Sequence, residues 1–162
     1  MEKEFLEIIQ RNQGIVHKVC SFYCDSEDDR KDLFQEIVAQ LWKSFPSFRK
    51  ESKFSTWMYR VALNTAITSF KKTKRRPDQG KLAYENLQVP DESYDQETED
   101  NIKLLHKAIG RLTGIEKSII LLFLENKKYE EIAEITGITQ NYVRVKMNRI
   151  KKKLKTYMDI EE

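Results

Sequence analysis

The sequence predicts an all-α protein with two small helical domains joined by an acidic linker, the C-terminal domain carrying a helix-turn-helix. Glycine and proline number only 5 and 3 in 162 residues, too few for an all-β fold with many tight turns. Apolar residues recur at helical spacing in both halves of the chain. The segment 78–100 holds eight acidic residues and one lysine, which leaves 28 basic and 18 acidic residues elsewhere, a net charge of +10. We therefore expect domains at 1–77 and 101–162 with the linker between them.

The first domain should contain three helical stretches. The first runs from Lys3 to Cys24, with Gly14 as its weak point. Asp25 and Ser26 can cap the second. Two apolar rows in that helix each step by four residues, so together they predict one wide buried stripe. The rows are Leu33, Ile37 and Leu41, and beside it Phe34, Val38 and Trp42.

A third helix is expected to begin with Ser55 or Thr56 as its N-cap. It continues to Phe70 and leads into a basic run that Pro77 stops. Trp57 and Phe54 stand near its start, and their spacing is compatible with core packing or with stacking on nucleic-acid bases.

The second domain carries the most specific local pattern, YEEIAEITGITQNYVR at 129–144. A helix-turn-helix needs a small residue where its helices cross, which Ala133 supplies, and a turn residue that tolerates positive φ, which Gly137 supplies. Thr139 can cap the second helix, and apolar residues at the right spacing clamp the pair. The clamp residues are Ile132, Ile138, Val143 and Met147. We expect helices at 129–136 and 140–157, two more before them, and DNA contact by the second helix of the pair.

Composition excludes several other classes of protein. Two basic bodies indicate a polyanionic partner, nucleic acid before membrane, and no direct membrane binding is expected. The longest apolar run, 119–124, is far too short to span a bilayer, and the N-terminus has no signal-peptide pattern, so a cytoplasmic location is expected. No catalytic set or phosphate-binding loop is present, which argues against an enzyme and against a cofactor. His17, Cys20 and Cys24 share a helix face but lack a fourth ligand, so we expect core residues and no metal; a redox role for the cysteines stays open.

The N-terminal half gives the chain a family resemblance. DLFQE at 32–36, followed by Leu41 and Trp42, resembles the sigma-factor segment that docks on the clamp helices of the RNA polymerase β′ subunit. FRKESKFSTW at 48–57 and YRVALNTA at 59–66 look like the segment that opens and reads the −10 promoter element. The helix-turn-helix resembles the −35 reader. The chain is thus identified as similar to the small extracytoplasmic-function sigma factors of the sigma-70 family.

The resemblance implies a role for each of three residue groups. Core polymerase binding is expected of Asp32, Gln35, Glu36, Leu41 and Trp42. Contact with −10 DNA is expected of Phe48, Arg60, Asn64, Lys71, Lys72, Lys74, Arg75 and Arg76. Contact with −35 DNA is expected of Gln140, Asn141, Arg144, Val145, Lys146, Asn148 and Arg149. The implied partners are the polymerase core, through its β′ clamp helices and β flap, promoter DNA, and an anti-sigma factor.

Two other interpretations explain fewer features of the sequence. A stand-alone helix-turn-helix regulator would explain the residues after Asn101 but would leave 32–76 without a purpose. An RNA-binding adaptor would need the sheet and aromatic platforms that RNA modules use, and these patterns are missing.

Overall fold

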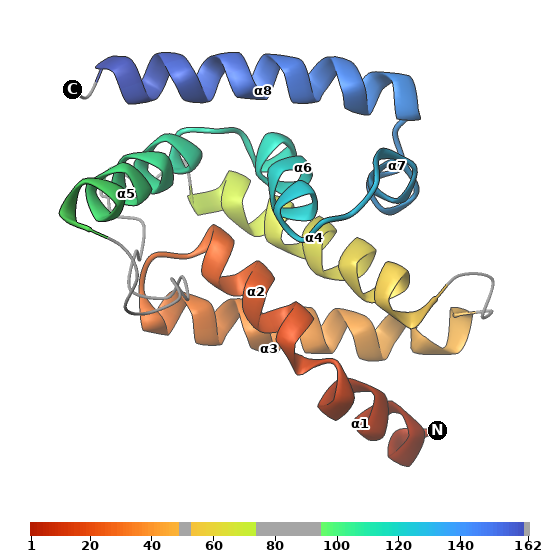
Figure 1. Cartoon of the computed structure of the whole chain (residues 1–162). Helices are drawn as coiled ribbons and strands as arrows, with labels where there is room; N and C mark the ends of the chain where they lie inside the picture. The colour runs from red at the N-terminus through yellow and green to blue at the C-terminus, as the bar shows by residue number, and fades with distance from the viewer. Residues whose placement is uncertain (49–52, 74–94, 161–162) are drawn as a thin grey trace.

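The computed structural model describes residues 1–48, 53–73 and 95–160, and these residues confirm the predicted all-α fold (Figure 1). The helices are α1 Glu2–Arg11, α2 Gln13–Tyr23, α3 Glu27–Ser44, the short 3-10 turn η1 Phe45–Ser47, α4 Phe54–Thr73, α5 Gln96–Gly110, α6 Gly114–Leu124, α7 Tyr129–Thr136 and α8 Gln140–Ile160. Within the described ranges, none of these helices has the length and apolar character needed to cross a bilayer.

The first four helices form a lower body, in which α2 and α3 pack on α4. The expected single stretch from Lys3 to Cys24 is two helices, because the chain bends at Asn12 (φ −122°, ψ 21°), whose side-chain amide donates to the Ile8 carbonyl. The weak point is therefore Asn12, and Gly14 lies inside α2. An Asn that bonds its own backbone competes with helix continuation, which explains the bend.

Helix α3 confirms one predicted feature and corrects another. Ser26 is its N-cap, and the Ser26 hydroxyl accepts a hydrogen bond from the Asp29 backbone at 3.0 Å. The row from Leu33 to Leu41 is buried as expected. The neighbouring row is not, because Trp42 at its end is 44% exposed. The expected start of α4 is also wrong: the helix begins at Phe54, before both proposed caps.

Helices α5 to α8 form an upper body, and α5 begins earlier than expected. The Asp95 carboxylate accepts a hydrogen bond from the Thr98 backbone at 2.9 Å, and α5 starts at Gln96. Residues 96–100 are thus helical, which shortens the expected linker 78–100. Acidic side chains favour the positive end of the helix dipole, so Glu97 and Glu99 belong to a first turn rather than to a linker. The residues 74–94 of the expected connection lie outside the described residues.

Helix α6 starts with a capping box that is tied to α8. Thr113 and Glu116 exchange backbone–side-chain hydrogen bonds of 2.9 and 3.2 Å. The other Glu116 oxygen accepts a 2.6 Å bond from Lys153 of α8. Burial alone would raise the pKa of Glu116, but the hydrogen bonds from Lys153 and the Thr113 backbone, with the Lys153 charge, hold the pKa below its usual value.

The two bodies are packed against each other, with α4 lying against α6 and α7 (Figure 1). The Tyr23 hydroxyl donates a buried 2.6 Å hydrogen bond to the Gly114 carbonyl. The Lys117 ammonium, on a residue only 3% exposed, lies 4.3 Å from the centroid of the Phe70 ring. At the edge, Lys18 forms a 2.8 Å ion pair with Glu125. The sequence predicts two bodies but not this interface, which makes one continuous core.

Candidate nucleic-acid and protein interfaces

The helix-turn-helix is formed by α7 and α8 with the predicted geometry. Gly137 ends α7 with φ +81°, the left-handed conformation that glycine adopts without strain. The Thr139 hydroxyl accepts a 3.1 Å hydrogen bond from the Tyr142 backbone, which caps α8. The clamp is also formed, since Ile132, Val143 and Met147 have no exposed surface. The N-terminal turns of α8 are thereby fixed with one face outward.

That outward face holds the residues expected to contact −35 DNA. The exposed members are Gln140, Asn141, Arg144, Val145, Asn148 and Arg149, and Lys146 is half-buried. Lys146 is restrained, because its ammonium lies 5.6 Å from the centroid of the Tyr142 ring. Among the later lysines, Lys153 is bonded to Glu116, whereas Lys151, Lys152 and Lys155 are exposed. The structure thus presents cations and amides on one helix whose start is rigidly capped, a geometry suited to a major groove.

Helix α4 brings together part of the group expected to contact −10 DNA. Asn64 is exposed, and Lys71 and Lys72 are exposed at the end of the helix. Arg60 is engaged with the upper body: its guanidinium donates a 2.8 Å hydrogen bond to the Glu134 carbonyl of α7. The last three members of the group, Lys74, Arg75 and Arg76, lie outside the described residues.

Phe48, the remaining member, belongs to an aromatic cluster at the start of α4. Its ring centroid lies 4.8 Å from that of Phe54 and 5.0 Å from that of Trp57. Trp57 also packs on Phe45 and is 7% exposed. Core packing therefore accounts for Trp57, and the half-buried Phe48 and Phe54 rings form the outer part of the cluster.

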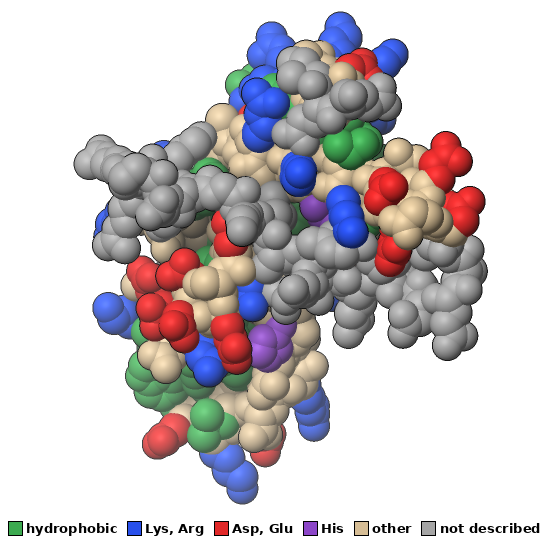
Figure 2. Space-filling model, turned by 90° about the vertical axis from the view of Figure 1, so that its left-hand side faces the viewer, with side chains coloured by type: hydrophobic (Ala, Val, Ile, Leu, Met, Phe, Trp, Pro, Cys, Tyr) green, Lys and Arg blue, Asp and Glu red, His purple; other side chains and the backbone are tan. Residues whose placement is uncertain are grey.

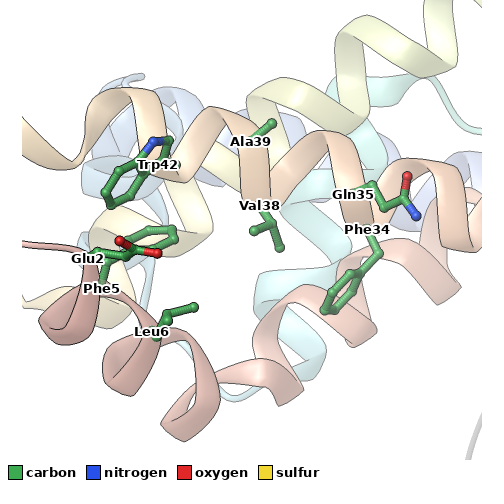
Figure 3. A pocket seen from close by; sticks show the side chains of 8 residues that line it. All are labelled: Glu2, Phe5, Leu6, Phe34, Gln35, Val38, Ala39 and Trp42. Carbon is green, nitrogen blue, oxygen red and sulfur yellow. The ribbon is translucent and has the colours of Figure 1, made fainter.

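An apolar groove of about 590 Å³ lies between α1 and α3 (Figure 3). Its lining residues are Glu2, Phe5, Leu6, Phe34, Gln35, Val38, Ala39 and Trp42. Side chains from both helices point into it, those of Phe34, Val38 and Trp42 facing Phe5 and Leu6. Leu6 and Trp42 are 51% and 44% exposed, and large apolar side chains that are exposed together form the kind of contiguous patch that marks an interaction site.

Two residues of the expected polymerase-binding group, Gln35 and Trp42, line this groove. Asp32 and Glu36 are exposed on the same helix. Leu41 is a correction: it has no exposed surface, because it faces the core of the lower body, and it does not form part of the surface. Sequence reasoning missed the contribution of α1 to the groove, although the position of Leu6 outside the Phe5–Ile9 row indicates an unburied apolar residue.

Acidic and basic side chains are concentrated at different places on the surface. Figure 2 views the molecule from the end where α3 begins, and it shows Asp and Glu side chains gathered on the lower body below Lys and Arg side chains at the top, over the C-terminal part of α8. The acidic first turn of α3 consists of Glu27, Asp28 and Asp29. An acidic rim beside an apolar groove suits a protein partner, and a basic helix suits DNA.

The shared face of His17, Cys20 and Cys24 does not form a ligand cluster. The His17 ring stacks on Phe34 with 4.7 Å between centroids. Burial and, to a smaller extent, the neighbouring Cys24 raise the pKa of Cys20 to about 12 against the lowering effect of the Arg30 charge. Burial is also the main cause that raises the pKa of Cys24 to about 11. Both cysteines are free thiols. Thiols with such pKa values stay protonated near neutral pH, which makes them poor nucleophiles and poor redox sensors.

Fold and surfaces together describe an all-helical protein with a capped helix-turn-helix in one body and an apolar groove on the other. Comparisons with known proteins specify the class. Residues 8–76 match the family model of sigma-70 region 2, and residues 102–154 match that of sigma-70 region 4. Over 160 residues the chain is 31% identical to the ECF RNA polymerase sigma-E factor of Haemophilus influenzae, covering 91% of this chain and 84% of the relative. It is 29% identical over 147 residues to the RNA polymerase sigma factor SigV of Bacillus subtilis, covering 90% and 86%.

Solved structures agree on the fold. CnrH, solved in complex with the cytosolic domain of CnrY, superposes with a TM-score of 0.68 at 15% identity, covering 100% of this chain and 92% of CnrH. The sigma factor RpoE of Bartonella quintana, solved with the anti-sigma factor NepR, gives 0.67 at 17% identity, covering 99% and 98%. The chain belongs to the extracytoplasmic-function sigma factors of the sigma-70 family. It is a transcription initiation factor that directs RNA polymerase core to promoters, and sigma factors are not enzymes.

Proposed function

We propose that this sigma factor divides promoter initiation among three surfaces: the α1–α3 groove binds the β′ clamp helices of core polymerase, α4 reads and opens the −10 element, and α8 reads the −35 element. In this scheme the body within 1–77 performs the first two tasks and the body within 101–162 performs the third, with contact to the β flap. The supporting observation is that α1 and α3, which line the groove, lie on the opposite side of the molecule from α8 (Figure 1). One chain can therefore bind a protein and DNA at the same time. Because polymerase and promoter DNA share the bacterial cytoplasm, the chain acts there.

The arrangement in which the two bodies are packed against each other, called the closed form below, must open before both promoter elements can be read by one chain. The two promoter elements, named for their positions, are about 25 base pairs apart, roughly 85 Å at ~3.4 Å per base pair. In the closed form Arg60 is bonded to the Glu134 carbonyl at 2.8 Å, and Gln140 at the start of α8 is only six positions after Glu134. At ~3.6 Å per residue, Arg60 and the start of α8 are therefore no more than about 25 Å apart. A base-reading Arg60 and a −35-bound α8 consequently require the bodies to separate.

An anti-sigma factor is a further proposed partner. RpoE of Bartonella quintana was solved with such a protein, NepR, and CnrH was solved with the cytosolic domain of CnrY. A partner of this kind would hold the chain inactive by covering a surface that polymerase or promoter DNA needs. The exposed groove on α1 and α3 is one surface whose occupation would block polymerase.

The test is a run-off transcription assay with purified chain, core polymerase and genomic fragments, in which discrete transcripts that need the chain are expected. Charge reversal of Asp32 and Glu36 to Lys should abolish binding to core but leave duplex DNA binding by the free chain unchanged. Arg144→Ala combined with Arg149→Ala should abolish duplex DNA binding but leave binding to core polymerase unchanged. The matched controls are Glu99→Lys and Lys107→Ala on the exposed face of α5, which should change neither. If the first pair of substitutions left core binding intact, the assignment of the groove helix would be wrong.

A further inference from the structure

The outward face of α8 carries two exposed apolar side chains among polar ones. Tyr142 is 43% exposed and Val145 is 37% exposed. The core side of the helix is fixed by Val143, Met147 and Ile150, none of which has exposed surface. At about 100° per residue, Val145 stands opposite that core side, at the centre of the outward face. Tyr142 is one turn earlier along the same face.

The fold gives no reason for an apolar residue at position 145. More than a third of the Val145 surface is left exposed, and its β-branched side chain loses rotamer freedom in a helix, so a straight-chain polar residue would suit this position at least as well. Tyr142 is held in place: its backbone donates to the Thr139 cap at 3.1 Å, and the Lys146 ammonium lies 5.6 Å from its ring centroid. A restrained aromatic ring and a stiff aliphatic side chain therefore form a small preorganised apolar patch.

The surroundings of the patch indicate what it contacts. Its exposed neighbours are Asn141, Arg144 and Arg149, which suit phosphates and base edges rather than the apolar centre of a protein interface. In the major groove, the one apolar group that distinguishes a base pair is the C5 methyl group of thymine. We propose that Tyr142 and Val145 read thymine methyl groups, so that the duplex element recognised by α8 contains T·A pairs at neighbouring positions. This inference rests on the proposed −35 role of α8.

The first experiment selects duplexes from a random-sequence library with the holoenzyme, formed from full-length chain and core polymerase. We expect T·A pairs to be enriched at one or two neighbouring positions of the upstream element. Each enriched thymine is then replaced by deoxyuridine, which removes only the methyl group. Binding should weaken about fourfold at the contacted position, the factor that corresponds to losing the burial of one methyl group.

Side-chain variants assign the effect to the patch. Val145→Ser and Tyr142→Ser should each bind thymine and deoxyuridine duplexes equally at one position, whereas Val145→Thr, which keeps one branch methyl, should retain part of the discrimination. Both positions are exposed, so the variants should fold. The control is Lys152→Ala on the exposed face of α8, which should weaken both duplexes alike and keep the discrimination.

Three results would overturn the inference, and the first two are distinguishable from failure of the −35 role. If Arg144→Ala abolishes upstream binding but deoxyuridine changes nothing at any position, the helix reads DNA without the methyl contacts. If the serine variants weaken holoenzyme assembly and leave the discrimination intact, the patch contacts protein. If Arg144→Ala leaves upstream binding unchanged, α8 is not the −35 reader, and both the proposed role and this inference are wrong.

Discussion

Replacing Tyr23 by Phe should release the closed arrangement of the two bodies. Burial raises the pKa of Tyr23 far above its usual value, so the hydroxyl keeps its proton and donates to the Gly114 carbonyl at 2.6 Å. Phe retains the ring, whose centroid lies 5.9 Å from that of Phe70. The same carbonyl is the acceptor for the first turn of α6, so it is not left without a partner. The expected loss is that of one net hydrogen bond, about 1 kcal/mol, which shifts the closed–open equilibrium about fivefold.

The assay is energy transfer between dyes placed through unnatural amino acids at Gln40 of α3 and Lys152 of α8, both exposed. The low-transfer population should rise about fivefold in Tyr23→Phe if the open state is minor in the parent protein, and apparent affinity for core polymerase should rise by the same factor if only the open state binds productively. The matched control is Tyr157→Phe in α8, which leaves the ring beneath Arg111.

A second readout separates the two DNA elements. Since Arg60 is engaged with α7 in the closed form, single-stranded −10 DNA should bind Tyr23→Phe more tightly than it binds the parent chain. Duplex −35 DNA should bind both proteins equally, because the outward face of α8 is exposed whether the bodies are closed or open. The reasoning is refuted if Tyr23→Phe lowers thermal stability yet shows the energy transfer and −10 affinity of the parent.

Further predictions concern stability and thiol chemistry. The folded-state pKa of Glu116 lies below its unfolded value, so its contribution to the free energy of unfolding is present at neutral pH and is lost as pH falls through and below about 4.3. The free energy of urea unfolding, measured between pH 7 and 4, should therefore depend less on pH in Glu116→Gln than in the parent chain. Gly137→Ala, at φ +81°, should lower the stability of the fold by roughly 1–2 kcal/mol. Gly14→Ala, inside α2 with open space around the added carbon, should raise it by about 0.5–1 kcal/mol. Thermal melts in which both variants shift in the same direction would contradict this. Thiol titration at pH 7 should label Cys20 and Cys24 only after denaturation, and fast labelling of the native chain would reopen a redox role.

The helix-turn-helix was predictable because its determinants are local. A glycine at positive φ, a Thr cap and an apolar clamp all act within a few residues of each other, so the bounds of α7 and the start of α8 agree with the pattern. Periodicity alone fails where burial depends on a distant partner. Trp42 continues an apolar row, yet α1 covers it only in part, through the Phe5 ring, and the rest of the side chain lines a groove. Leu41 shows the converse, since a motif shared with a binding segment does not say which of its residues face inward.

The interface between the bodies could not be read from the sequence. Lys117 is charged and would ordinarily be placed on a surface, but it is buried against the Phe70 ring. Composition also misled the interpretation of 96–100, because acidic residues typical of a linker are equally typical of a first helical turn. Both errors arise from the same cause: a residue type reports a local preference, and its partner in the fold decides how that preference is satisfied.

The closed form does not hide all three working surfaces, and this implies an order of events. The α1–α3 groove and the outward face of α8 are exposed while the bodies remain in contact, so polymerase and duplex DNA can each bind first. Arg60 is the exception among the proposed contact residues, because in the closed form its guanidinium donates a hydrogen bond to the Glu134 carbonyl. If Arg60 reads the −10 element as proposed, each contact that holds the bodies together opposes that step, and it opposes core binding only as far as core polymerase prefers the open form. Binding of core polymerase can drive the separation only by as much as it prefers the open form. On the proposed roles, substitutions that weaken the contacts of Tyr23 and Lys117 should therefore make promoter opening easier.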